Sequence, residues 1–129
     1  MICAINTQEQ RVIANGTVAL TSRQSTSCSL SLRDNEVCIT FPGVYAIQWS
    51  VTGELGKAGK LEFAAYDQDT ALSGSLAAQK VPVSIETTLT STPVIVVVKS
   101  QNEPAKISIK NTGTVAVIRN AVLSVHKVY

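Results

Sequence analysis

The stretch VYAIQWSVT, residues 44–52, decides the fold of this chain. Its large apolar side chains recur at every second position, at Tyr45, Ile47, Trp49 and Val51, with small or polar side chains between them. Successive side chains of a β-strand point to opposite faces of its sheet, so this alternation predicts a strand with one face in a core. β-branched side chains, which suit pleated strands better than helices, recur throughout the chain.

Turn signals on both sides of this stretch divide the chain into short strands. Asn15-Gly16 predicts a tight hairpin between residues 11–14 and 17–21. Further strands are expected at residues 27–32, 36–41, 60–66, 81–90, 94–98, 106–110 and 115–129. No window has a helical period over the length that a helix needs. We therefore predict an all-β antiparallel sandwich or barrel of eight to ten strands, with one domain over residues 11–129 and an N-terminal arm over residues 1–10.

The core of this domain should be mainly aliphatic, because the chain has two Phe, three Tyr and one Trp. The alternation assigns these inward positions: Tyr45, Ile47, Trp49, Phe63, Leu123 and Val125.

Two expected strands are apolar on both faces. One is the run 94–98, and the other is the last strand, where Val117, Ala121, Leu123 and Val125 would fill one face. Its other face would carry Ile118, Val122, His126 and Val128. Such a strand lies either under the protein's own loops or at a subunit interface, and we predict the interface.

Charge and hydropathy exclude several classes of protein. The net charge is +2 and no basic run is present, so the sequence does not have the concentrated positive surface that binds nucleic acid. No apolar stretch approaches the roughly 18 residues of a membrane span, and the N-terminus does not have the features of a signal peptide. We expect a protein made in the cytoplasm, unless the chain is a fragment of something longer.

The three cysteines are expected to be reduced and mostly structural. Matching the apolar faces of residues 27–32 and 36–41 pairs Leu32 with Val37 and Leu30 with Ile39, and places Cys28 opposite Phe41. Cys38 then lies on the other face, about 10 Å along the ladder from Cys28. That separation exceeds the distance that a disulfide spans, and Cys3 remains an odd thiol.

No candidate for chemistry passes a spacing test. The sequence has one histidine, His126, but no Gly-x-Ser-x-Gly motif that would supply a nucleophilic serine for it to activate. It also has no Cys-x-x-Cys spacing, which would support a zinc site. Asp67 and Asp69 could bind a cation, but two carboxylates in a turn are more often turn formers. Residues 53–60 do not have the spacing of a phosphate-binding loop. We therefore predict no catalytic residue, metal or cofactor.

Two segments carry a resemblance to a known family. ITFPGVYAIQW, residues 39–49, resembles the Gly-x-Tyr strand of the complement-C1q and tumour-necrosis-factor jelly rolls, and NAVLSVHKVY, residues 120–129, is similar to their last strand. The layout of nearly the whole chain is similar to small C1q-like proteins encoded by bacteriophages and Firmicutes. The resemblance implies an antiparallel jelly-roll sandwich that forms a tight homotrimer.

The same resemblance implies a function in assembly. Members of this group serve as head decorations, head fibres or knobs of surface filaments. This chain has neither a Gly-X-Y stalk nor coiled-coil heptads, which favours a capsid decoration or head-fibre protein on the virion surface. Its partners would be copies of itself and a major capsid protein or another virion protein, contacted through the arm (Ile2, Ile5) or one face of the trimer. The alternative is a receptor- or glycan-binding knob of a phage fibre or of a filament on a bacterial cell or spore surface.

Overall fold

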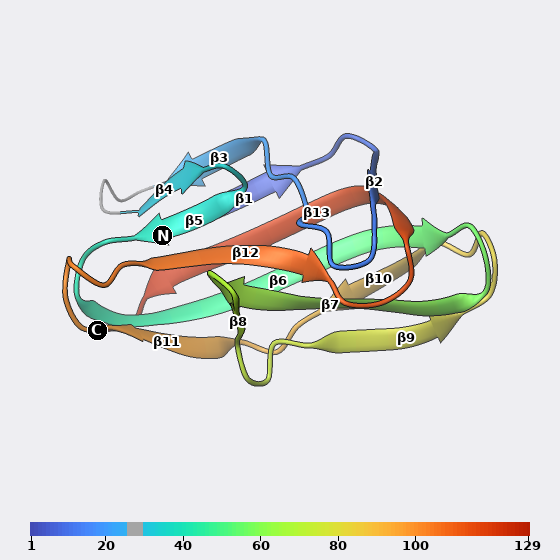
Figure 1. Cartoon of the computed structure of the whole chain (residues 1–129). Coiled ribbons are helices and arrows are strands. Elements are labelled where there is room, and N and C mark those ends of the chain that lie inside the picture. Colours follow the sequence, from blue (N-terminus) through green and yellow to red (C-terminus); the bar gives the residue numbers. More distant parts are fainter. Residues whose placement is uncertain (26–29) are drawn as a thin grey trace.

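The computed structural model describes residues 1–25 and 30–129, which form two antiparallel sheets packed face to face (Figure 1). Sheet A contains β1 (Ile2–Asn6), β2 (Gln10–Val12), β3 (Ser22–Ser25), β6 (Gly43–Leu55), β10 (Thr87–Thr90), β11 (Val94–Val98) and β13 (Ala116–Lys127). Sheet B contains β4 (Leu30–Arg33), β5 (Glu36–Ile39), β7 (Gly59–Asp67), β8 (Thr70–Ala71), β9 (Ala77–Val81) and β12 (Ala105–Asn111). None of the described residues is helical, so this part of the chain has no helix that could cross a membrane.

The all-β antiparallel sandwich predicted from the alternation is confirmed. Thirteen strands are present among the described residues, more than the eight to ten expected, because short strands such as β2 and β8 add to the ladders. The long strands β6 and β13 pair in the middle of sheet A, with Trp49 opposite Leu123 and Ile47 opposite Val125. β11 and β10 extend the sheet from the other edge of β6, and β1 and β3 from the other edge of β13.

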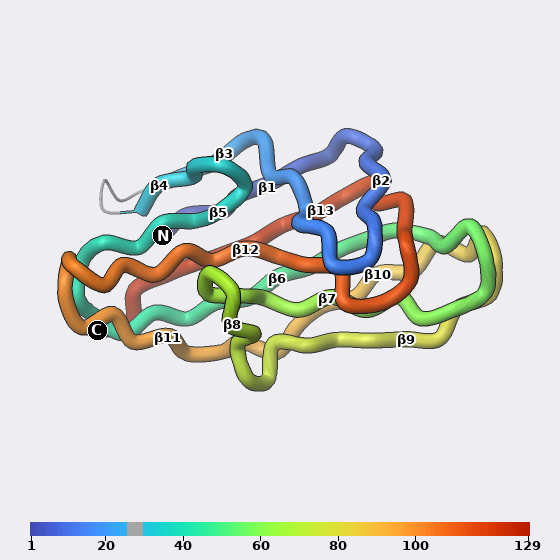
Figure 2. Tube along the Cα trace, in the orientation of Figure 1, coloured from blue at the N-terminus to red at the C-terminus, as the bar shows by residue number. Residues whose placement is uncertain are grey.

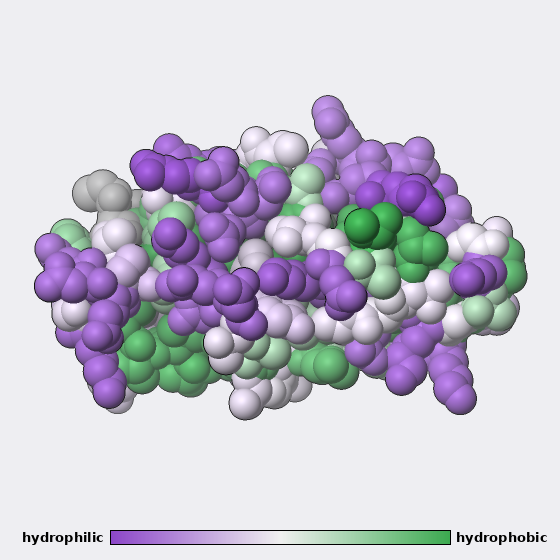
Figure 3. Space-filling view, viewed as in Figure 1, coloured by the Kyte–Doolittle hydropathy of each residue, from purple (hydrophilic) through white to green (hydrophobic). Residues whose placement is uncertain are grey.

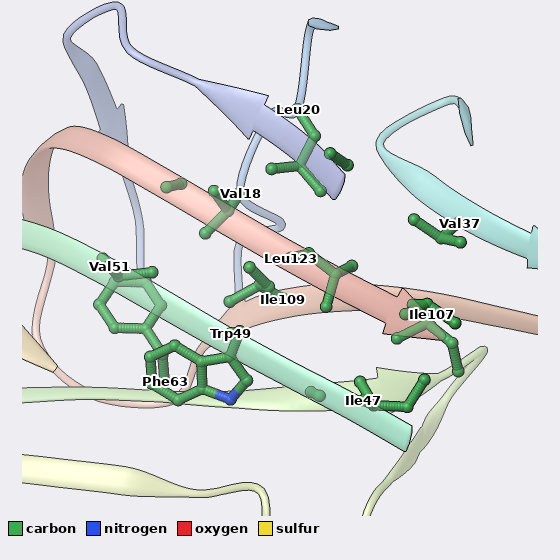
Figure 4. Packing of buried hydrophobic residues seen from close by; sticks show 14 of the residues in the cluster. Val18, Leu20, Val37, Ile47, Trp49, Val51, Phe63, Ile107, Ile109 and Leu123 are labelled. Carbon is green, nitrogen blue, oxygen red and sulfur yellow. The ribbon is translucent and has the colours of Figure 1, made fainter. Parts of the chain in front are cut away.

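The core lies between the two sheets and is centred on Trp49 (Figure 4). Its indole packs edge-on against Phe63, with ring centroids 6.2 Å apart and planes inclined by 62°. The indole nitrogen donates a 2.8 Å hydrogen bond to the carbonyl of Ser75. All six side chains that the alternation assigns to the core are buried.

Ser75 supports this core from the loop between β8 and β9. Its buried hydroxyl accepts a hydrogen bond from the amide of Ala65 and contacts the carbonyls of Ala65 and Leu72 at 3.1 and 2.7 Å. A buried polar group costs free energy unless it is paired, so these bonds allow the loop after β8 to pack under Trp49.

The hairpin of β4 and β5 has the predicted register, with Leu30 opposite Ile39 and Leu32 opposite Val37. Cys28 lies outside the described residues, so its expected position opposite Phe41 is not described. Cys3 and Cys38 are free thiols on different sheets.

The expected hairpin at Asn15-Gly16 is wrong. The turn exists, but β2 before it pairs with β13 of sheet A, whereas Thr17 after it bridges to Lys110 of sheet B. The turn therefore carries the chain between sheets. The segments before and after the turn are joined instead by the side-chain amide of Gln10. It donates to the backbone carbonyl of Ala19 at 3.0 Å and accepts from the backbone amide of Ala19 at 2.8 Å.

The expected strand over residues 81–90 is interrupted. A turn lies before β10, with Ser84 at a φ of 59°, and its amide donates to the carbonyl of Leu55. Val83 and Ile85 alternate correctly for a strand, but both are exposed because this turn leaves the sheet.

The two segments that carry the family resemblance meet in space. A Cβ on Gly43 would lie 2.7 Å from the carbonyl oxygen of Tyr129, so only glycine allows this approach. The amide of Val128 donates to the carbonyl of Val44 at 2.7 Å, and the chain ends beside β11 (Figure 2). The Tyr45 hydroxyl donates to the carbonyl of Phe41 at 2.8 Å. Gly43 and Tyr45 thus place the end of the last strand against the start of β6.

Candidate assembly face

The outer face of sheet A is formed by the side chains that alternate with the buried ones. Cross-strand partners share a face, so the strand registers place these side chains in rows across β11, β10, β6, β13 and β1. We refer to the part of this surface that extends from β11 to the row of Thr52 and Asn120 as the sheet A face; it comprises Cys3, Ile5, Ala46, Gln48, Ser50, Thr52, Thr88, Thr90, Ile95, Val97, Asn120, Val122, Ser124, His126 and Val128. Beyond that row the outer face of sheet A is charged, at Arg11, Glu54 and Arg119.

The sheet A face carries no Asp, Glu, Lys or Arg. Its middle rows are neutral polar, and the hydroxyls of Thr52 and Thr88 lie 2.8 Å apart across two strands. Charged residues are depleted from the cores of protein interfaces, because burying an unpaired charge is costly. A face without charge over five strands therefore has the composition of a surface that becomes buried.

One corner of this face is apolar and exposed. Ile95 and Val97 are each 58% exposed on β11, which forms an edge of the sheet. Val128 is 47% exposed, and its backbone amide bonds to Val44, the cross-strand partner of Val97. β11 is thus apolar on both faces, because Val94, Val96 and Val98 point into the core. An apolar edge strand is a site where another chain can pack.

A shallow hollow of about 210 Å³ lies near the centre of the sheet A face. It is lined by Gln48, Trp49, Ser50, Thr90, Val122 and Ser124. Val122 is half-buried in this hollow. A partner side chain could enter it and contact Val122 directly.

The opposite end of β13 is charged and closes the neutral face. Arg119 Nη2 lies 3.0 Å from Glu54 Oε1 and 3.2 Å from Glu9 Oε1. The hydrogen bond to Glu54, the charge of that carboxylate and the charges of Glu9 and Glu86 raise the pKa of Arg119, although desolvation opposes them. The cluster marks the limit of the neutral surface.

Three of the four predicted interface residues, Val122, His126 and Val128, lie on the sheet A face, but Ile118 does not. Ile118 is fully buried, because the register of β13 shifts between Ile118 and Asn120. This bulge inserts one residue, Arg119, and thereby turns both Ile118 and Ala121 toward the core. Strict alternation through the last strand was therefore the wrong assumption.

The N-terminal arm is also corrected. Residues 2–6 form β1, which pairs with β13 on one side and β3 on the other, and Ile2 is fully buried in the core. Ile5 lies on the sheet A face in the row of Val122. No separate arm is therefore left at these residues to contact a capsid.

Sequence reasoning missed most of the sheet A face. Ile95 and Val97 could have been identified from the both-sided apolar run that contains them. The neutral rows carried a signal too, because the outward positions of 44–52 contain no charge. Their neighbours across the sheet could not be known without the register.

The outer face of sheet B is different and largely hydrophilic (Figure 3). The registers place seven charged side chains on it: Arg33, Glu36, Lys60, Glu62, Lys80, Lys106 and Lys110. Lys60 forms a 3.6 Å ion pair with Glu62, and the Lys110 ammonium lies 4.8 Å from the ring centroid of Tyr66.

The candidate metal ligands are dispersed among the described residues, where no three His, Cys, Asp or Glu side chains come together. Asp67 has a structural role, because its carboxylate accepts a 3.0 Å hydrogen bond from the amide of Lys106. Asp69 is exposed at the next turn.

No protein-family profile matches this sequence, and no curated protein matches it. Among solved structures, Eiger TNF from S. frugiperda is similar, with a TM-score of 0.72 at 12% identity over 98% of this chain and 92% of that one. PRD1 vertex protein P5 has a TM-score of 0.55 at 11% identity, over 95% of this chain and 93% of P5. Murine APRIL has a TM-score of 0.55 at 9% identity, over 94% and 95% of the two chains. The chain therefore has the jelly-roll fold of the tumour-necrosis-factor-like proteins.

Proposed function

We propose that this chain is a structural virion protein, a homotrimer that decorates the capsid or forms a head fibre. The observation that carries the proposal is the sheet A face, which has no charged side chain over five strands and has an exposed apolar corner at Ile95 and Val97. A closed ring of three subunits would cover this face, whereas an open contact would leave it partly exposed.

The fold comparison supports a role in a virion. PRD1 P5 is a vertex protein with a similar jelly roll. Decoration needs extra contacts across a shell and no reaction, since any protein that binds only the assembled shell stabilises it by mass action. The proposal accordingly includes no catalytic residue and no cofactor.

The remaining partner would be a major capsid protein or another virion protein, with the protein on the virion surface. Because β1 is part of sheet A, this contact would use a folded surface of the trimer and not a free arm.

Two measurements test the proposal. Light scattering of the purified protein should give three times 13.7 kDa, and a clean monomer at micromolar concentration would refute the trimer. Immunogold labelling of virions from the source that encodes the chain should place gold on the particle surface. Labelling confined to cell envelopes would instead favour the surface-filament knob.

A further inference from the structure

A polar groove of about 420 Å³ lies on the outer face of sheet B. Its floor is formed by the outward side chains of β12, namely Lys106, Ser108 and Lys110. The turn between β4 and β5 lines one side with Asp34, Asn35 and Glu36. The turn after β7 lines the other side with Gln68 and Asp69, and Thr17 completes the lining.

The two turns that line the groove are fixed by hydrogen bonds to neighbouring elements. Asn35, at a φ of 66°, accepts a 3.1 Å bond from the amide of Leu20 through its side chain. Gln68 has a φ of 55°, and its backbone amide donates a hydrogen bond to the carbonyl of Lys106 at 2.9 Å. Non-glycine residues in this region of φ carry strain that the surrounding structure has to offset. The groove is therefore largely preformed.

The charged side chains of the groove are not paired with one another. Asp34, Glu36 and Asp69 have no ion pair within the part of the chain that the structure describes, nor does Lys106. Lys110 contacts the Tyr66 ring, which adjoins the floor because Tyr66 pairs with Ser108. The groove thus offers carboxylate acceptors, ammonium donors, and hydroxyl and amide groups that do both.

This mixture favours a ligand that has no net charge and both donates and accepts hydrogen bonds. A cation would be repelled by the two lysines, and a phosphate or sulfate by the three carboxylates. An apolar ligand would leave the polar lining without partners. A saccharide presents several neutral hydroxyls, each of which donates and accepts, and the volume is within the usual range of small-ligand sites.

We infer that this groove binds a neutral saccharide. The site lies on the opposite sheet from the proposed trimer contacts, so it stays open in the trimer and its occupancy does not depend on the decoration role. On a virion it would allow the protein to bind a surface polysaccharide.

The test is a titration of the isotope-labelled full chain, followed by its amide NMR signals, with four probes added separately. The probes are lactose, N,N′-diacetylchitobiose, inorganic phosphate and calcium chloride. The inference expects at least one saccharide to give saturable shifts confined to the turns and floor of the groove. Concentrations up to about 50 mM are needed, because small neutral ligands bind weakly.

Matched variants distinguish the groove from general surface effects. Glu36→Gln and Lys106→Met should each weaken the saccharide about tenfold, since each removes a charge-assisted hydrogen bond. Glu103→Gln and Lys99→Met make the same changes at exposed positions outside the groove and should leave the affinity unchanged.

Three results would overturn the inference. These are saturable shifts in the groove with phosphate or calcium only, no saturable shift with either saccharide, or saccharide shifts that Glu36→Gln and Lys106→Met do not weaken. The mass of the trimer is measured separately, so failure of the saccharide site and failure of the assembly proposal give different results.

Discussion

The two outer faces of the sandwich differ in charge, although strands of the same alternating pattern form both. The sheet A face carries no Asp, Glu, Lys or Arg, and the charges of this sheet's outer side lie beyond it at Arg11, Glu54 and Arg119, whereas the outer face of sheet B has seven such residues spread over its described strands. Both sheets contribute their inward side chains to one core, so folding itself does not require this difference. The difference therefore indicates what each face contacts outside the chain.

The free energy of desolvation explains why the two faces should have different partners. Neutral hydroxyl and amide groups can be buried if they find hydrogen bonds, whereas an unpaired charge is far more costly to bury. The sheet A face can therefore be covered by protein, and the outer face of sheet B remains suited to water and polar ligands.

The largest expected effect comes from placing a charge on the sheet A face. Val122→Asp would bury one carboxylate per subunit in the hollow of the sheet A face, and we expect the trimer to weaken by at least about 1000-fold. Light scattering at several concentrations measures this as a fall toward the 13.7 kDa of one chain.

The matched control puts the same charge on the other sheet. Ala78 is exposed on the outer face of sheet B, opposite Glu62, so Ala78→Asp should leave the trimer intact. If Val122→Asp stays trimeric while Ala78→Asp dissociates, the assignment of the two faces is reversed.

A second prediction separates the two sides of β13. Ile118→Ala removes a fully buried side chain and should lower the free energy of unfolding by about 2–5 kcal/mol. Val122→Ala, on the sheet A face, should cost the fold much less and act mainly on assembly. Urea denaturation of both variants checks this, and equal losses would contradict the bulge at Arg119.

A third prediction concerns the core layer that the two faces share. Desolvation raises the pKa of Tyr45, so its neutral form is favoured in the folded state. Stability from this group is fully present below the unfolded pKa of about 10 and is lost as pH rises through the higher folded pKa. Tyr45→Phe should cost about 1 kcal/mol at pH 7, through the lost bond to Phe41, and should remove this alkaline loss. Denaturation of the unchanged chain and of Tyr45→Phe at pH 7 and above pH 10 measures both effects. Equal losses of the free energy of unfolding above pH 10 in the two proteins would contradict the prediction.

The smallest expected effect is on the outer face of sheet B. Lys110→Met removes the ammonium from the Tyr66 ring and should lower the free energy of unfolding by no more than about 1 kcal/mol. Thermal melts compared with those of Lys99→Met measure it. A loss of several kcal/mol would mean that the charges of sheet B hold the fold together.

The sequence was sufficient for elements whose signal is local. The alternation of residues 44–52 identified the inward side of β6, and the apolar match of Leu30 and Leu32 to their partners identified the β4–β5 register. The errors lie where distant pairing decides. β1 has only five residues, and it is a strand because β13 pairs with it from the other end of the chain. The bulge that buries Ile118 likewise has no local signal, so the candidate interface could be predicted only in part.

The position of β13 between β6 and β1 has a consequence for the time at which this protein folds. β1 and β6 leave the ribosome before residues 116–127, yet these residues are what joins the two strands. Sheet A therefore cannot close while those residues are still inside the ribosome. Until then, the apolar strands β6 and β11 have incomplete ladders, and nascent chains with unpaired edges are prone to aggregate. Folding of this domain thus waits until its last strand, β13, has left the ribosome.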